Sequence, residues 1–215
     1  MIESSTGIVL RTRPLTETSL IVHWLTPSLG RIATAAKGAR RPKSPFAGKL
    51  DLFYLADFSF SRSRHSDLHA LREVNLCETH GAIRADILKL QQAAYAANFI
   101  TQVTETETPL PAVFELLREF LDCLCGQKNG PQPVFAFELK LLKQLGLEPN
   151  LAESSFAAGT KKIAAILAEN DFSTAWNLKL TEAQTVELRQ FLHGFLIFHL
   201  GRLPKGRAAA LAGGA

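Results

Sequence analysis

One short stretch of the sequence concentrates the residue types that bind polyanions. From Lys37 to Lys49 there are five cationic side chains and no acidic one, and the two glycines and two prolines within it disfavour a helix. The charges are therefore expected on an ordered or partly ordered loop. Such a loop suits the phosphate backbone of a nucleic acid, although clusters of this size also occur as ordinary solvated surface.

The net charge is distributed unevenly along the chain. Residues 1–77 contain eleven Lys and Arg against six Asp and Glu, a balance of +5, whereas residues 78–215 contain thirteen against fourteen, a balance of −1. All of the excess positive charge is therefore N-terminal. This asymmetry indicates a nucleic-acid-binding module joined to a module with another role.

The residues around the basic loop alternate with the period of two that is typical of β-strands. Strands are expected at residues 7–13, 19–26, 31–37, 52–61 and 67–76, with turn residues between them. Five strands at this spacing predict a small barrel. The OB-fold is the five-stranded barrel commonly used to bind nucleic acid.

From residue 79 onward the apolar residues recur with a helical period. Helices are expected at residues 82–103, 113–126, 135–147, 161–169 and 181–200, and the last begins with the capping-box sequence Thr181-Glu182-Ala183-Gln184. Residues 101–111 are interpreted as a linker. The predicted fold class is α+β with several domains: an OB-fold barrel in residues 1–78, an all-α helical domain in 79–203 and a flexible tail in 204–215.

The sequence contains no arrangement that favours an enzyme. It has no phosphate-cradling glycine motif, no paired nucleophile and base, and three cysteines, Cys77, Cys123 and Cys125, without metal-ligand spacing. In an extended strand, His65, Asp67 and His69 would share a face, as a metal site requires. They lie at a predicted hairpin tip with no evident fourth ligand, so we expect neither a metal nor another cofactor.

The composition is that of a globular protein, with 47% hydrophobic and 20% charged residues. The N-terminus lacks the pattern of a signal peptide, and no apolar run approaches membrane-spanning length. We therefore expect a cytoplasmic protein.

Several motifs, spread over about residues 5–150, match those of one known family. They are Gly7-Ile8-Val9-Leu10-Arg11, Thr16-Glu17-Thr18-Ser19-Leu20-Ile21-Val22, Leu25-Thr26, Leu29-Gly30-Arg31, Ala36-Lys37-Gly38-Ala39-Arg40-Arg41, Leu71-Arg72-Glu73, Asp86, Ala94-Tyr95 and Phe137-Glu138-Leu139-Lys140-Leu141-Leu142-Lys143-Gln144-Leu145-Gly146. With these motifs the chain resembles the bacterial recombination mediator protein RecO family. The basic element after its Gly-Arg strand is the most specific match.

The resemblance implies a non-enzymatic DNA repair factor that acts in the bacterial cytoplasm at the nucleoid. Proteins of this kind bind single- and double-stranded DNA through the OB domain, anneal complementary strands and help to load recombinase. They contact the C-terminal tail of the single-stranded-DNA-binding protein and a ring-forming RecR-like partner. In this chain, the phosphate contacts are expected from cations of the barrel and loop: Arg11, Arg13, Arg31, Lys37, Arg40, Arg41 and Lys43.

Two departures from the family pattern bear on these expectations. Many members carry a four-cysteine zinc site after the third helix, where residues 147–160 contain no cysteine. Some members have an arginine just before the Phe-Glu-Leu motif, where this chain has Phe135-Ala136. A pocket for the acidic partner tail would then use the neighbouring lysines, on a groove formed by Leu139, Lys140, Leu142 and Lys143.

Two other classes of function stay open. An OB-fold RNA-binding or translation-associated factor would share the barrel and the basic loop, and a preference for structured RNA over single-stranded DNA would favour it. A structural adaptor, whose basic loop is only solvated surface, would bind no nucleic acid even at low salt.

Overall fold

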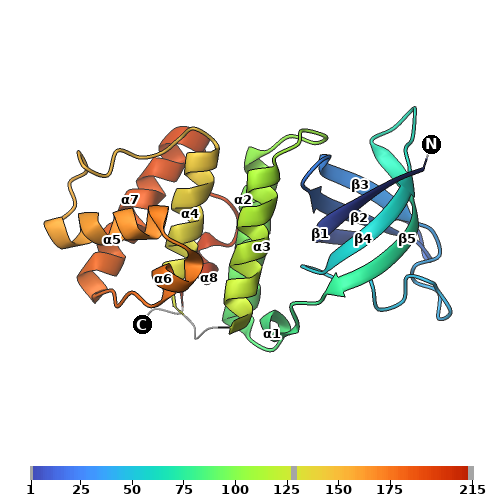
Figure 1. The fold of residues 1–215 in the computed structure, drawn as a ribbon, viewed down its shortest axis with the longest axis horizontal. Helices are drawn as coiled ribbons and strands as arrows, with labels where there is room; N and C mark the ends of the chain where they lie inside the picture. The colour runs from blue at the N-terminus through green and yellow to red at the C-terminus, as the bar shows by residue number, and fades with distance from the viewer. Residues whose placement is uncertain (1, 127–129, 213–215) are drawn as a thin grey trace. The chain divides into compact units, whose positions relative to one another are not determined.

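The chain forms two compact units in the computed structural model, which describes residues 2–126 and 130–212 (Figure 1). The first unit contains Met1–His80 and Thr104–Glu115, and the second contains Gly81–Val103 and Leu116–Ala215. The chain thus first passes from one unit to the other between residues 80 and 81, close to the domain boundary predicted at residue 78. The segment Thr104–Glu115 overlaps the linker predicted at residues 101–111 within the helical domain, but it belongs to the first unit.

The first unit is a closed barrel of five strands in the order β1-β2-β3-β5-β4, which confirms the predicted architecture (Figure 1). All neighbouring strands are antiparallel except β3 and β5, which are parallel. The strands are β1 Ile2–Pro14, β2 Leu20–Thr26, β3 Gly30–Ala36, β4 Leu55–Ser61 and β5 Leu68–Glu78. Strand β1 starts earlier than predicted because residues 2–8 pair with β4.

The inner side chains of all five strands form the barrel core, and its centre is aromatic. Trp24 has no exposed surface and stacks on Phe58, with ring centroids 4.2 Å apart. Its indole Nε1–H donates a 2.8 Å hydrogen bond to Thr34 Oγ1, which satisfies the one polar atom of the ring. Phe46, from the loop between β3 and β4, is 6% exposed and joins the same core. The loop is therefore anchored by apolar packing.

The turn between β2 and β3 is held by Thr26. Its hydroxyl donates to Gly30 O and accepts the backbone N–H of Leu29, both at 3.0 Å. Gly30 has a φ of +66°, and a Cβ there would collide with the backbone of Thr108. Glycine is therefore required, both by the left-handed backbone and by the close passage of the Thr104–Glu115 segment.

The second unit is helical, and its core includes Phe99, Phe120 and Phe137. The helices are α1 Gly81–Arg84, α2 Ile87–Val103, α3 Pro111–Gly126, α4 Gln132–Gln144, α5 Ala158–Glu169, α6 Phe172–Trp176, α7 Glu182–Leu200 and α8 Arg207–Ala210, with the start of α3, up to Glu115, in the first unit. The predicted helix 82–103 is divided because Asp86 Oδ1 accepts the N–H groups of Leu88 and Lys89 and begins a new helix.

The capping box predicted at Thr181 and Gln184 is confirmed at the start of α7. The short helix α6 was not predicted, because five residues are too few to show a helical period.

The prediction of a flexible tail at residues 204–215 is wrong for residues 204–212. This segment contains α8, and Arg207 is only 5% exposed. Its guanidinium donates two hydrogen bonds to the fully buried carboxylate of Glu138, at 2.6 and 2.9 Å, and the hydroxyl of Tyr95 donates to the same carboxylate. Burial, together with that negative charge, raises the pKa of Tyr95. The last three residues lie outside the described part of the chain.

Candidate nucleic-acid interface

The loop from Lys37 to Lys49 is a series of hydrogen-bonded turns, attached to the turn between β1 and β2. The backbone N–H of Arg40 donates to Thr18 O at 3.0 Å, and that of Gly38 donates to Ser19 Oγ at 3.3 Å. Gly38 has a φ of +71°, which a residue without a Cβ adopts readily. The basic loop is therefore an ordered surface.

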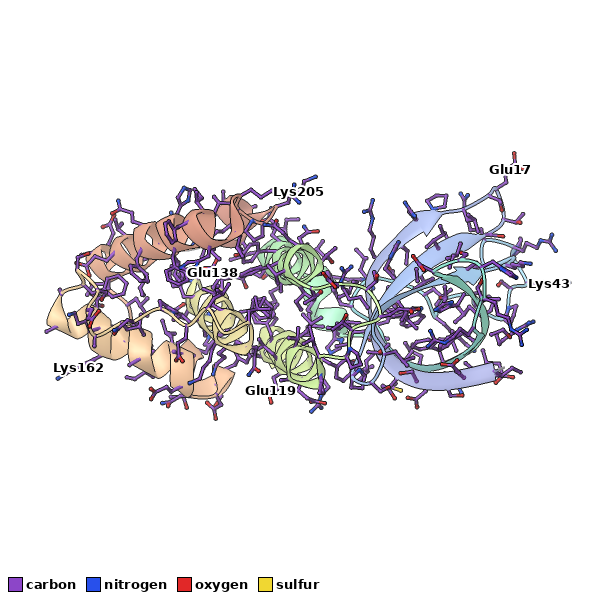
Figure 2. All side chains as sticks on the ribbon, turned by 90° about the horizontal axis from the view of Figure 1, so that it is seen from above. Glu17, Lys43, Glu119, Glu138, Lys162 and Lys205 are labelled. Carbon is purple, nitrogen blue, oxygen red and sulfur yellow. The ribbon has the colours of Figure 1, made fainter. Side chains whose placement is uncertain are left out.

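Four cations of the loop are exposed: Lys37, Arg40, Arg41 and Lys43. Figure 2 shows Lys43 and Glu17, the acidic residue of the β1–β2 turn, projecting from the same end of the barrel. Lys49 has another role, because its ammonium group donates a 3.1 Å hydrogen bond to Val74 O. The loop thus presents four positive side chains to solvent.

The strand surface beside the loop carries further positive charge. Arg11 lies opposite His23 in the pairing of β1 with β2, and Arg13 lies opposite Ile21; both arginines are exposed. The pKa of His23 is lowered, first by burial and then by the charges of Arg13, Arg11 and Arg31. Because three guanidinium groups act on one imidazole, this face of β1, β2 and β3 is a second positive surface.

Arg31 differs from the other predicted contact residues. It is partly buried, its Nε donates a 2.8 Å hydrogen bond to Thr104 Oγ1, and its guanidinium also donates to Thr104 O. Burial lowers its pKa. The side chain therefore holds the Thr104–Glu115 segment on the barrel. Sequence reasoning missed this because Thr104 is far away along the chain.

The histidines of the predicted β4–β5 hairpin do not form a cluster with Asp67. His69 is 2% exposed; its Nε2 lies 2.9 Å from Glu107 Oε1 and its Nδ1 accepts the N–H of Ser63. His65 and Asp67 are exposed. Within residues 2–126 and 130–212, no group of three or more His, Cys, Asp or Glu side chains could hold a metal ion.

Comparison with known proteins decides the family. The family described as "Recombination protein O N terminal" matches residues 1–80, and "Recombination protein O C terminal" matches residues 84–156. The "DNA repair protein RecO" of Bacillus pumilus (strain SAFR-032) is 30% identical over an alignment of 212 positions, which covers 94% of this chain and 81% of that protein. The chain belongs to the RecO family of DNA repair proteins.

A second relative supports the assignment along almost the whole length. The "DNA repair protein RecO" of Anaeromyxobacter sp. (strain K) is 29% identical over an alignment of 231 positions, which covers 92% of this chain and 91% of the relative. The barrel that carries the basic loop is thus the N-terminal domain of a RecO family member. Among the helices in the described part of the chain, none is long and apolar enough to cross a membrane.

The helical residues suggested by the RecO resemblance do not form the expected groove. Leu139 and Leu142 are 2% and 0% exposed, because α4 is covered by other helices, so they cannot touch a partner. Lys140 is partly buried, and its ammonium group donates a 3.2 Å hydrogen bond to Ala168 O. Lys143 is exposed, and its Nζ lies 3.3 Å from Glu148 Oε1. Of these four predicted residues, only the two lysines are accessible to a ligand.

The pKa of His23 leads to a prediction for nucleic-acid binding. In the free protein, the lowered pKa disfavours the protonated imidazole of His23. DNA phosphates placed beside Arg11 and Arg13 would favour this protonated form. DNA affinity should therefore rise as the pH falls through the range at and below about 6.5, by at most about tenfold per pH unit for one proton. We expect His23→Gln to flatten this pH dependence, measured by fluorescence anisotropy. A steep dependence that persists in the variant would exclude His23 as its source.

Proposed function

We propose that this RecO family member binds single- and double-stranded DNA without sequence preference, anneals complementary strands and assists recombinase loading in recombination repair. The observation that carries the proposal is the ordered loop with four exposed cations next to the arginines of β1. This role would place the protein at the nucleoid in the bacterial cytoplasm.

The chemistry of this surface suits contact with the DNA backbone. Lysine and arginine side chains neutralise phosphates and release condensed counterions, which gives affinity without base recognition. Annealing requires the same property, because two negatively charged strands must approach each other before their bases pair. Contacts from Lys37, Arg40, Arg41, Lys43, Arg11 and Arg13 would reduce that repulsion; Arg31 would contribute only through its position beside them.

A strand-annealing assay tests this proposal. Two complementary labelled oligonucleotides are mixed with and without the protein over a range of salt concentrations. We expect faster annealing and tight binding of single strands at low salt, with both effects falling as salt rises. Absence of binding at low salt would favour the structural adaptor. Clear preference for structured RNA would favour the RNA-binding or translation-associated factor.

We further propose that the helical unit contacts the acidic C-terminal tail of the single-stranded-DNA-binding protein, and that a RecR-like protein is a second partner. Family membership supports both proposals. Lys143, and to a lesser extent Lys140, are the cations on α4 that could meet a carboxylate. Titration with an acidic peptide that ends in a free carboxylate tests the first contact. Unchanged peptide binding in Lys143→Glu would place that contact elsewhere.

A further inference from the structure

A hollow opens beside the basic loop, and the phosphate contacts proposed above do not use it. Part of it is built by the loop itself, through Ala39 and Phe46, and part by the residues that precede β4, through Leu50, Asp51 and Tyr54. Its empty volume is about 530 Å³ with its open mouth included. The hollow and the loop cations therefore belong to one local surface of the barrel.

Most residues that line the hollow have apolar side chains, while polar atoms contribute about half of its exposed surface. Leu20, Ala39, Leu50 and Tyr54 are each partly exposed and pack on the barrel core. Phe46, the other aromatic residue, is almost completely buried and supports the floor. Tyr54 thus supplies the aromatic surface that a ligand could reach. A partly exposed aromatic side chain in such a hollow is a stacking surface for a flat ring that also carries polar edge groups.

The charges around the hollow indicate which part of a nucleic acid would enter it. Arg40 and Arg41 follow Ala39 directly in the sequence, and the exposed carboxylate of Asp51 lies in the lining of the hollow. None of the residues that line the hollow is a cation, so a phosphate would be attracted to the arginines of the loop and not into the hollow. A nucleobase is neutral and has two apolar faces, so the hollow fits the base and the loop fits the backbone.

We propose that this hollow receives an unpaired nucleobase of a DNA strand whose phosphates lie along the basic loop, with the ring of Tyr54 as its stacking surface. This inference rests on the proposed DNA-binding function. It adds a preference for single strands, because a base inside a duplex already has both faces stacked. Stacking is tolerant of base identity, so the site would not confer sequence specificity.

Binding by three ligands of equal phosphate number tests the proposal: an oligothymidylate, the same backbone without bases, and a duplex. The wild-type protein should bind the oligothymidylate about 5- to 100-fold more tightly than the abasic strand. In Tyr54→Leu this preference should largely disappear, while affinity for the abasic strand and the duplex stays at the wild-type level. The conservative variant Tyr54→Phe keeps the ring and should keep the preference.

Two results would overturn the proposal. One is equal wild-type affinity for the base-bearing and abasic strands, a comparison that does not depend on how any variant folds. The other is a folded Tyr54→Leu protein, checked by its melting temperature, that retains the full preference for bases. Binding of the abasic strand that still weakens with rising salt would leave the proposed DNA-binding function intact, whereas loss of all DNA binding would contradict that function itself.

Discussion

Replacement of Arg207 by alanine is expected to destabilise the helical unit by about 3–5 kcal/mol. The guanidinium makes two hydrogen bonds to Glu138, whose side chain is fully buried. Removal of the cation leaves an uncompensated carboxylate in the core, which is the costly way to break a buried ion pair. Urea denaturation followed by circular dichroism at 222 nm, which reports mainly on helices, measures the loss.

Arg202→Ala is the matched control for this variant. Arg202 is an exposed residue only a few positions away, so its loss should change stability by no more than about 0.5 kcal/mol. The double variant Glu138→Leu with Arg207→Leu removes both charges and should recover much of the lost stability. An Arg207→Ala protein as stable as the control would show that the segment after α7 does not hold the unit together.

Replacement of Trp24 by alanine should have a similar effect on the barrel, with a loss of about 3–5 kcal/mol. The change leaves a large cavity against Phe58 and removes the hydrogen-bond donor to Thr34. Because the basic loop is anchored in the same core by Phe46, DNA affinity should fall together with the folded fraction. Urea titrations with and without single-stranded DNA measure both quantities.

Trp24→Phe provides the comparison for the barrel core. It keeps an aromatic ring for Phe58 but not the indole N–H, so its loss of stability should be clearly smaller than that of the alanine variant. A loss below about 1 kcal/mol in Trp24→Ala would contradict the role assigned to this side chain.

Local sequence patterns predicted most of the barrel. Alternating apolar residues and turn residues marked all five strands, and the lack of acids between Lys37 and Lys49 marked the exposed loop. The parallel pairing of β3 with β5, which closes the barrel, joins residues far apart in sequence and leaves no local pattern. The same holds for the hydrogen bonds of Arg31 to Thr104, which give an arginine predicted to contact DNA a structural role.

Helical periodicity predicted the existence of the longer helices but not their surroundings. Leu139 and Leu142 lie on the apolar stripe of an amphipathic pattern, and such a stripe is the same whether a partner or another helix of the same unit covers it. The prediction of a flexible tail is wrong for a related reason. The small residues after α7 are typical of disorder, but the guanidinium of Arg207 donates to the buried carboxylate of Glu138 on α4.

The central claim is that the basic loop contacts the DNA backbone. Its most direct test is the salt dependence of single-stranded DNA binding by the double variant Arg40→Ala with Arg41→Ala. Each phosphate contact contributes a log-log slope of about −0.7, so loss of two should change the slope by roughly +1.4. The control, Arg64→Ala with Arg72→Ala, removes the same charge from the exposed β4–β5 hairpin region and should leave the slope unchanged. An unchanged slope in the Arg40 and Arg41 variant, or equal changes in both variants, would contradict the claim.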